Sequence, residues 1–295
     1  MTIPVIRGTT RADLLSLPSI MLGFPPEDSC VVMALRGTSV KFCARIDLEW
    51  FAEQFERVSA QVLRCAREAE ADEFVFIGYG DPDVAGDAVA RFTDHVGERN
   101  VLEALVTDGR RAWSIFEAGG PEPYRFETSA VAAQAVYSGV NLAVDRATAV
   151  APITTSEPAG REALAEAERE VAVMSDEVGM ERLRELAEGC GPLTAPQALL
   201  LAVLLGDDDR MTALLCRLTM ANADAMWERL VAARRVGPEP YENNVLGLLG
   251  FASWLSGRGA AHSACLQELT RRCSSHPLLL TLARLHRDGV PPTKW

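Results

Sequence analysis

The hydrophobic positions in the first part of the chain change repeatedly between helical spacing and strand-like runs. An apolar segment at residues 14–22 predicts a short helix or turn that ends at Gly23, because Pro25-Pro26 forbids its continuation. Two β-branched runs follow at residues 30–35 and 40–46, and Gly37-Thr38 between them predicts a hairpin. Apolar side chains at intervals of three and four over residues 51–69 then predict a helix that covers a sheet.

The next segment continues the same alternation. Residues 73–79 (EFVFIGY) form a nearly continuous apolar run, typical of a strand buried on both faces, and a helix is predicted over residues 84–96. Residues 101–106 and 112–116, joined by Asp108-Gly109, predict a second hairpin. The order β-β-α-β-α-β-β therefore predicts an α/β fold, in which helices pack on a mixed sheet.

From about residue 128 the strand pattern disappears, and residues 152–158 (PITTSEP) predict a linker. The rest of the chain has helical patterning with short loops, which predicts an α-helical bundle or solenoid. The expected helices cover residues 161–188, 195–205, 208–220, 223–234, 241–256, 260–274 and 277–288. We therefore predict two domains, an α/β domain at residues 1–155 and an α-helical domain at residues 156–295.

One helical segment has a more specific pattern. LGFASW, followed by Gly257, resembles the first helix of a tetratricopeptide (TPR) unit, but no 34-residue repeat recurs. The sequence therefore predicts one TPR-like hairpin and not a TPR array.

Charge and composition narrow the classes of function. The formal net charge of −12 repels nucleic acid and anionic lipid, and the arginines form isolated pairs instead of a basic stripe. Neither an apolar run of about 20 residues nor an export signal in MTIPVIRGTTRAD is apparent. The seven cysteines are scattered and never form C-x-x-C. We expect a soluble cytoplasmic protein with reduced thiols and neither nucleic acid nor membrane as a partner.

Recognisable catalytic patterns are missing from the sequence. The four histidines are His95, His262, His276 and His286, and neither G-x-S-x-G nor H-E-x-x-H accompanies them. Walker and dinucleotide fingerprints are also missing, so we predict no cofactor and no metal. Structural or solvent-facing roles are favoured for all four histidines.

The best candidate for a ligand site is the segment from Gly78 to Asp83, which follows a buried strand and opens a helix. Its candidate residues are Gly78, Gly80, Asp81 and Asp83. The Asp81 and Asp83 carboxylates would repel a phosphate, but with Asp47 they could bind a divalent cation. The alternative is that Asp83 caps the helix and Asp81 shapes the turn.

A second loop could complete this site. Glu27 and Asp28, in the loop at residues 25–29, would approach Asp81 if both loops formed one pocket. The alternative is that Glu27 and Asp28 only shape the turn before the first strand.

Two tryptophans are candidates for partner binding. Trp254 lies at helical spacing with other aromatic residues, a pattern that is more often core than a binding groove. Trp295 follows Pro291-Pro292 at the end of the chain, where it either docks onto the helices or is presented to another chain.

Several blocks of sequence resemble one family. DLLSLPSIMLGFPPEDSCVVMALRG is similar to the opening signature of the actinobacterial family 4192 of domains of unknown function (DUF4192). DGRRAW, VAAQAVYSGV and LGLLGFASWLSGRGAAHSACLQEL resemble its second hairpin, its following helix and its C-terminal region. The resemblance implies an actinobacterial or actinobacteriophage origin and supplies no catalytic residues. Many members carry a cysteine-rich loop after the second hairpin, but residues 117–127 (EAGGPEPYRFE) contain no cysteine, so no metal or redox role is carried over.

Two hypotheses of function follow. The favoured one is a non-enzymatic interaction or regulatory protein, whose helical half binds a protein partner or a second copy of itself. The alternative is an enzyme acting on a small molecule or nucleotide, with a pocket in the α/β half and a divalent metal.

Overall fold

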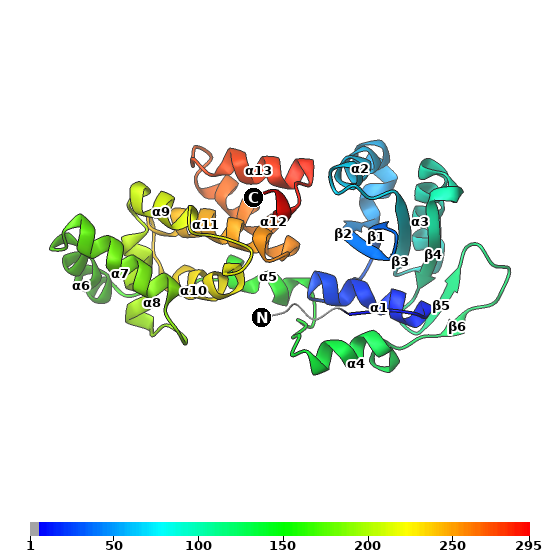
Figure 1. Cartoon of the computed structure of the whole chain (residues 1–295), viewed down its shortest axis with the longest axis horizontal. Helices are drawn as coiled ribbons and strands as arrows, with labels where there is room; N and C mark the ends of the chain where they lie inside the picture. The colour runs from blue at the N-terminus through cyan, green and yellow to red at the C-terminus, as the bar shows by residue number, and fades with distance from the viewer. Residues whose placement is uncertain (1–5) are drawn as a thin grey trace. The chain divides into compact units, whose positions relative to one another are not determined.

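The computed structural model describes residues 6–295 and forms two compact units (Figure 1). The α/β unit comprises Met1–Arg146 with Arg287–Val290, and the helical unit comprises Ala147–His286 with Pro291–Trp295. Residues 1–5, which open the segment considered for export, lie outside the described residues. Among residues 6–295, no helix combines the length and the apolar character needed to cross a bilayer.

A six-stranded mixed sheet forms the centre of the α/β unit, which confirms the predicted sheet type. The strands are β1 (Ser29–Arg36), β2 (Ser39–Asp47), β3 (Glu73–Tyr79), β4 (Val101–Thr107), β5 (Arg111–Ser114) and β6 (Glu122–Pro123). Their order is β2-β1-β3-β4-β5-β6; β3 and β4 pair in parallel, and the other neighbours are antiparallel. Both predicted hairpins are present, whereas β6 was not predicted because two residues carry no periodic signal.

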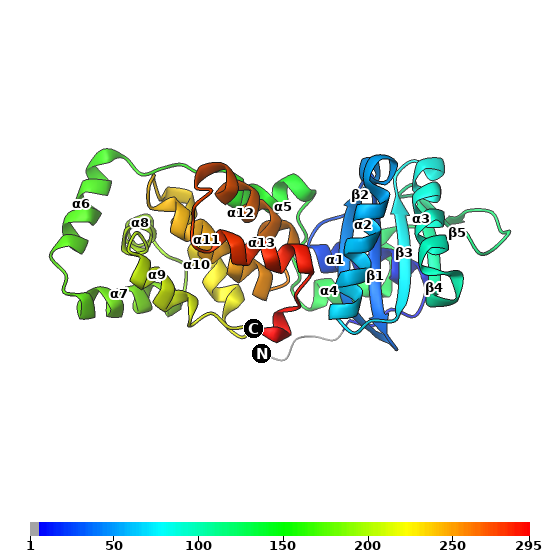
Figure 2. The ribbon, with the colours of Figure 1, turned by 90° about the horizontal axis from the view of Figure 1, so that it is seen from above.

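Helices cover both faces of this sheet (Figure 2). The helices of the unit are α1 (Arg11–Leu22), α2 (Leu48–Glu68), α3 (Pro82–Val96) and α4 (Ala130–Tyr137). α2 and α3 pack on one face, where the rings of Phe76 and Phe92 stack with centroids 5.1 Å apart. α1 packs on the other face through Leu15, and α4 contacts α1. The sheet is thus buried on both faces, as the apolar β3 sequence indicates.

A buried carboxylate fixes the start of α1. The side chain of Thr10 accepts a hydrogen bond from the Asp13 backbone, while Asp13 accepts hydrogen bonds from the amides of Thr9 and Thr10, as in a capping box. The second Asp13 oxygen accepts from the amide of Val131 at 3.2 Å, in the first turn of α4. Burial raises the pKa of Asp13, but these hydrogen bonds together outweigh it and hold the pKa below its usual value. One side chain therefore holds the first turns of two helices together.

The described helices of the second unit alternate with short loops. They are α5 (Arg146–Thr154), α6 (Arg161–Ala172), α7 (Asp176–Glu188), α8 (Ala195–Leu204), α9 (Asp208–Leu215), α10 (Ala223–Val236), α11 (Glu242–Leu255), α12 (Gly259–Arg272) and α13 (Leu279–Asp288). The single helix predicted over residues 161–188 is wrong, because Ser175 caps a new helix by accepting a hydrogen bond from the Val178 amide. The predicted linker at residues 152–158 is helical as far as Thr154, because burial of Ile153 holds this segment in the unit.

The most deeply buried helix of this unit is α11. Its side chains are buried on every side from Asn244 to Leu255, whereas most surface helices bury one stripe. Two glycines let neighbouring segments approach it closely: a Cβ at Gly247 would lie 2.8 Å from His276 Cε1, and one at Gly250 would lie 3.1 Å from Leu282. α11 is therefore the core around which the other helices pack.

An ion pair is buried beside α11. Arg234 of α10 is fully buried and donates from Nη1 to Glu242 Oε2 at 2.9 Å, and its Nε donates to the carbonyl of Ile153 at 3.1 Å. Arg272 of α12 contacts the other oxygen of Glu242. One carboxylate thus joins α10, α11 and α12, and the same arginine reaches α5.

Candidate functional site

The structure brings the two predicted ligand loops together at one end of the sheet. Ser29 pairs with both Asp47 and Tyr79 across neighbouring strands, and the amide of Leu48 donates to the Asp28 carbonyl at 3.1 Å. Gly80 lies directly against Asp28, since a Cβ at this glycine would stand 2.7 Å from Asp28 Oδ1. Gly80 also has a φ of +125°, which side-chain-bearing residues rarely adopt. The loops are therefore neighbours because glycine occupies this position.

Two of the acidic residues near these loops, Asp81 and Asp47, have structural partners. Asp81 is the N-cap of α3, and its Oδ1 accepts hydrogen bonds from the amides of Asp83 and Val84 at 3.1 and 3.3 Å. The alternative in which Asp83 caps the helix is therefore wrong, because Pro82 occupies the first helical position and places the cap at Asp81. Asp83 lies exposed in the first turn of the helix. The carboxylate of Asp47 pairs with Arg45 at 2.6 Å.

Two further residues of the predicted site shape the backbone. Gly78 packs against α3, where a Cβ would lie 2.8 Å from the carbonyl oxygen of Ala85. Glu27 is exposed, and its backbone carbonyl accepts a hydrogen bond from Arg45 Nη2 at 2.9 Å. Across residues 6–295, no cluster of three or more His, Cys, Asp or Glu side chains is arranged to hold a metal ion.

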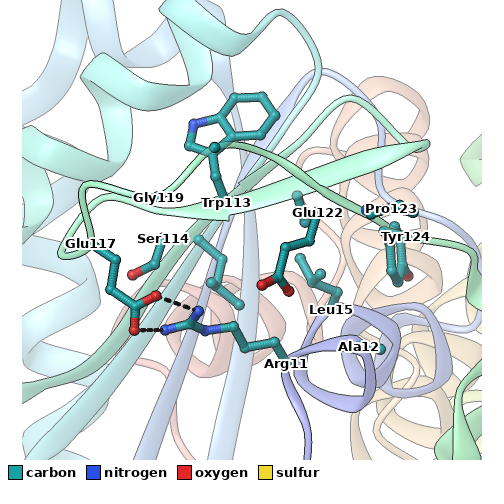
Figure 3. Close-up of a pocket in the computed structure, with 13 residues that line it drawn as sticks. Arg11, Ala12, Leu15, Trp113, Ser114, Glu117, Gly119, Glu122, Pro123 and Tyr124 are labelled. Atoms are coloured by element: carbon teal, nitrogen blue, oxygen red, sulfur yellow. Dashed lines mark hydrogen bonds and ion pairs between the residues drawn. The ribbon is translucent and has the colours of Figure 1, made fainter.

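A cavity of the α/β unit lies elsewhere, between α1 and the β4–β6 edge of the sheet (Figure 3). Its volume is about 80 Å³. The floor is apolar and includes Ala12, Leu15 and Leu105, whereas Arg11 and two glutamates supply charge at its rim. The indole of Trp113, whose residue also lines the cavity, points away from it (Figure 3) and packs in the core on the other face of the sheet.

Arg11 is the central polar group of this cavity. Its Nε donates to Glu103 Oε2 at 2.9 Å, and its two terminal nitrogens donate to the two carboxylate oxygens of Glu117 at 2.8 and 2.5 Å. Ser114 Oγ donates to the remaining oxygen of Glu103 at 2.6 Å. The hydrogen bonds from Arg11 hold the pKa of Glu117 below its usual value. Such a bidentate contact is the geometry by which arginine recognises carboxylates.

The histidines of the helical unit are engaged in packing. His276 Nδ1 accepts a hydrogen bond from the Leu278 amide at 3.2 Å, and its Nε2 lies 2.8 Å from Asn244 Oδ1. Because Nδ1 accepts, Nε2 carries the proton and donates to Asn244. His262 is buried with Nδ1 2.9 Å from the Gly250 carbonyl, and burial lowers its pKa to about 4. Both rings therefore join α11 to the segments around it.

The two predicted partner-binding tryptophans lie in contact. The ring centroids of Trp295 and Trp254 are 5.9 Å apart in an edge-to-face arrangement, and Phe251 lies 5.4 Å from Trp295. Trp295 Nε1 donates to the carbonyl of Leu218 at 2.9 Å. Trp254 is buried, whereas 52% of Trp295 remains exposed. We call these three rings the aromatic patch.

The cavity residues were not predicted from the sequence. Arg11 and Glu117 are 106 positions apart, and their contact depends on how α1 packs on the sheet. The sequence feature that could have pointed to the cavity is Gly119-Gly120-Pro121 after the second hairpin, because glycine and proline indicate a loop. Loops of this kind often carry function, but the pattern does not identify the helix that faces them.

The fold and these sites define a protein with an α/β unit that holds a small charged cavity and a helical unit that carries an aromatic patch. The chain belongs to the family described as a domain of unknown function (DUF4192), whose model matches residues 12–293. No curated protein and no solved structure matches the chain.

Proposed function

We propose that the protein is a non-enzymatic interaction protein, and that its helical unit binds a protein partner or a second copy of the chain at the aromatic patch. The observation that carries this proposal is the placement of Trp295. Phe251, Trp254 and the Leu218 carbonyl fix its indole, yet about half of the residue stays exposed.

A fixed but exposed tryptophan suits recognition for a physical reason. Binding residues that are already held in place lose little side-chain entropy when a partner covers them, and tryptophan is enriched among the residues that dominate binding energy. Met220, two residues beyond Leu218, is also about half exposed. Trp254 is buried, so its proposed role is to support Trp295 and not to touch the partner.

The proposal also assigns a role to the α11–α12 pair. α11 contains the TPR-like segment LGFASW and packs against α12, which follows after a short loop. Helical hairpins of this type build binding surfaces in repeat proteins. We propose that this pair acts as a single TPR-like unit that supports the aromatic patch.

The test compares the wild-type chain with Trp295→Ala as tagged bait at moderate salt, in a lysate of the source organism. Leu280→Ala is the matched control, because Leu280 is an apolar side chain of the helical unit that is 83% exposed. Mass spectrometry and light scattering on the eluate identify a partner or a second copy. Circular dichroism checks that each variant is folded.

We expect a stoichiometric partner, or a dimer, that Trp295→Ala loses and Leu280→Ala keeps. Identical eluates from the wild type and Trp295→Ala would contradict the proposal. So would a monomer without any stoichiometric partner.

The rival hypothesis is an enzyme of the α/β unit with a pocket between the loops of Asp28 and Asp81. It predicts that a divalent metal or a nucleotide raises the melting temperature, because a ligand that binds only the folded state stabilises it. Thermal unfolding with magnesium, manganese and a nucleotide panel tests this. An unchanged melting temperature in every condition would count against the enzyme.

A further inference from the structure

In the cavity of the α/β unit, the guanidinium of Arg11 lies between an inner and an outer glutamate. This site is separate from the aromatic patch of the helical unit. Glu103 lies behind Arg11, with 15% of its side chain exposed, and Ser114 fixes its orientation. Glu117 lies outside Arg11, and 59% of its side chain is exposed. The inner carboxylate thus holds the guanidinium, while the outer one occupies the edge that a ligand would use.

Glu117 belongs to a connecting segment that pairs with no strand of the sheet. It lies between β5 and β6, and Gly119 and Gly120 follow it. A Cβ at either glycine would meet no atom within 4 Å, so the segment is loosely packed there. Because an ion pair with an exposed partner contributes little to stability, displacement of Glu117 from Arg11 requires little energy.

A second carboxylate faces the same cavity. Glu122 lies on β6, and its backbone is fixed by pairing with Ala112 of β5. Its carboxylate points into the cavity (Figure 3) and forms no ion pair with any other residue of the described chain. The cavity therefore presents one guanidinium and one unpaired carboxylate above an apolar floor.

We propose that this cavity binds a small zwitterion of the α-amino acid class, with the ligand carboxylate replacing Glu117 on Arg11 and the ligand ammonium facing Glu122. The chain's own Glu117 shows the bidentate geometry that the ligand carboxylate adopts. The ligand side chain lies over Ala12, Leu15 and Leu105. In the ligand-free protein, Glu117 occupies the carboxylate position.

The charges around the cavity favour a zwitterion over an ion that carries a single charge. Glu103, Glu117 and Glu122 outnumber Arg11, so a plain anion meets net repulsion. A plain cation meets Glu122 but cannot use the donors of Arg11. A zwitterion satisfies both groups without changing the net charge of the site.

The experiment is a titration of the ¹⁵N-labelled full-length chain with each free L-amino acid, singly, up to about 10 mM. Chemical shifts of the Arg11 Nε–H and of the Ala12 and Ser114 amides report on the cavity. Propionate and ethylamine are matched probes, because each lacks one of the two charged groups of alanine. The variants Glu117→Gln and Glu122→Gln keep the side-chain shape at the rim.

At least one amino acid should bind to the wild type. Glu117→Gln should tighten its binding about threefold, because the competing carboxylate is gone, and Glu122→Gln should weaken it about threefold. Propionate and ethylamine should bind more weakly than alanine to the wild type and to Glu117→Gln. The opposite effects of the two substitutions separate a specific site from a general loss of structure.

Three results would overturn the proposal. The first is that no amino acid shifts these resonances in either the wild type or Glu117→Gln. The second is that both substitutions change binding in the same direction. The third is that propionate binds as tightly as the amino acids, which would identify a simple carboxylate site.

Discussion

Asp81 and Asp83 are chemically identical and two positions apart, yet they differ in structural role. Asp81 lies before the first helical residue with a non-helical backbone, and its side chain accepts hydrogen bonds from the free amides of the first turn of α3. Asp83 lies within that turn, where its charge only complements the helix dipole. The difference arises from Pro82, which is preorganised for the first helical position.

The two aspartates should therefore respond differently to substitution. Asp81→Ala should lower the free energy of unfolding by about 1 kcal/mol, because two amides lose their acceptor. Asp83→Ala should lower it by about 0.3–1 kcal/mol at low salt and by less at high salt, because only the dipole interaction is lost. Urea denaturation followed by circular dichroism measures both. A larger effect for Asp83→Ala would contradict the capping assignment.

At the scale of elements, α11 shows how a helix becomes the core of a unit. Its glycines weaken the helix by itself, since glycine costs about 1 kcal/mol relative to alanine in a helix interior. Gly247 is nonetheless required where His276 and Leu278 cross the helix. His276 is held by Asn244 and by the Leu278 amide, so its ring has no room to yield.

Gly247→Ala should therefore destabilise the protein by about 1–3 kcal/mol despite the better helix propensity of alanine, because overpacking outweighs it. Gly86→Ala in α3 is the matched control: a Cβ there meets no atom within 4 Å. This control should stabilise by about 0.5–1 kcal/mol. Chemical denaturation measures both, and a stabilising Gly247→Ala would show that the close approach of His276 is not maintained in solution.

The packing of α12 against α11 should depend on pH through His262. Burial lowers the pKa of His262 from 6.5 to about 4, so the folded protein keeps this ring neutral in a range where the unfolded chain takes up a proton. Stability is therefore fully present above pH 6.5 and falls as the pH decreases toward 4, by about 3 kcal/mol at most from this residue. His276, whose pKa burial also lowers, acts in the same direction.

The measurement is the melting temperature of the full-length chain between pH 7.5 and pH 4.5, for the wild type and His262→Leu. The variant loses the hydrogen bond to Gly250 at every pH, but its melting temperature should decline less on acidification. Equal declines for the two proteins would exclude His262 as a source of the pH dependence.

For the whole molecule, net charge determines how charged partners are attracted or repelled at a distance. The net charge is −12, and its field extends furthest at low salt. Many of the arginines are paired with carboxylates, among them Arg234, Arg258 and Arg272. Pairing within the protein leaves these cations less able to bind phosphates. The field that results repels polyanions.

We accordingly predict that the protein does not bind nucleic acid. Fluorescence anisotropy with labelled duplex DNA and single-stranded RNA at about 50 mM salt favours any electrostatic binding, because counterion release is then most effective. The anisotropy should not change as protein is added. Salt-sensitive binding under these conditions would contradict the prediction and point to a local basic surface.

The periodicity of the sequence was sufficient to predict much of the architecture. The β3 run is apolar at nearly every position, which specifies a strand buried on both faces. The amphipathic helices that flank it bury apolar side chains at a period of 3.6 and so specify the cover of the sheet. The break at Ser175 was missed because neither glycine nor proline lies next to it, and only the cap interaction shows where a new helix starts. β6 was missed because its pairing with β5 is its only distinguishing feature.

The sequence by itself determined the mixed sheet and most helix positions, since these depend on local patterning. The approach of the Asp28 and Gly80 loops was one of two alternatives that the sequence left open. Only the tertiary structure decided that Arg11 meets Glu117 beside Glu122, and that Trp295 docks on Trp254. Such contacts join residues distant in sequence, and the packing of whole elements sets their geometry. Local patterning specifies which side chains are buried, but it carries no information about which distant side chain lies opposite.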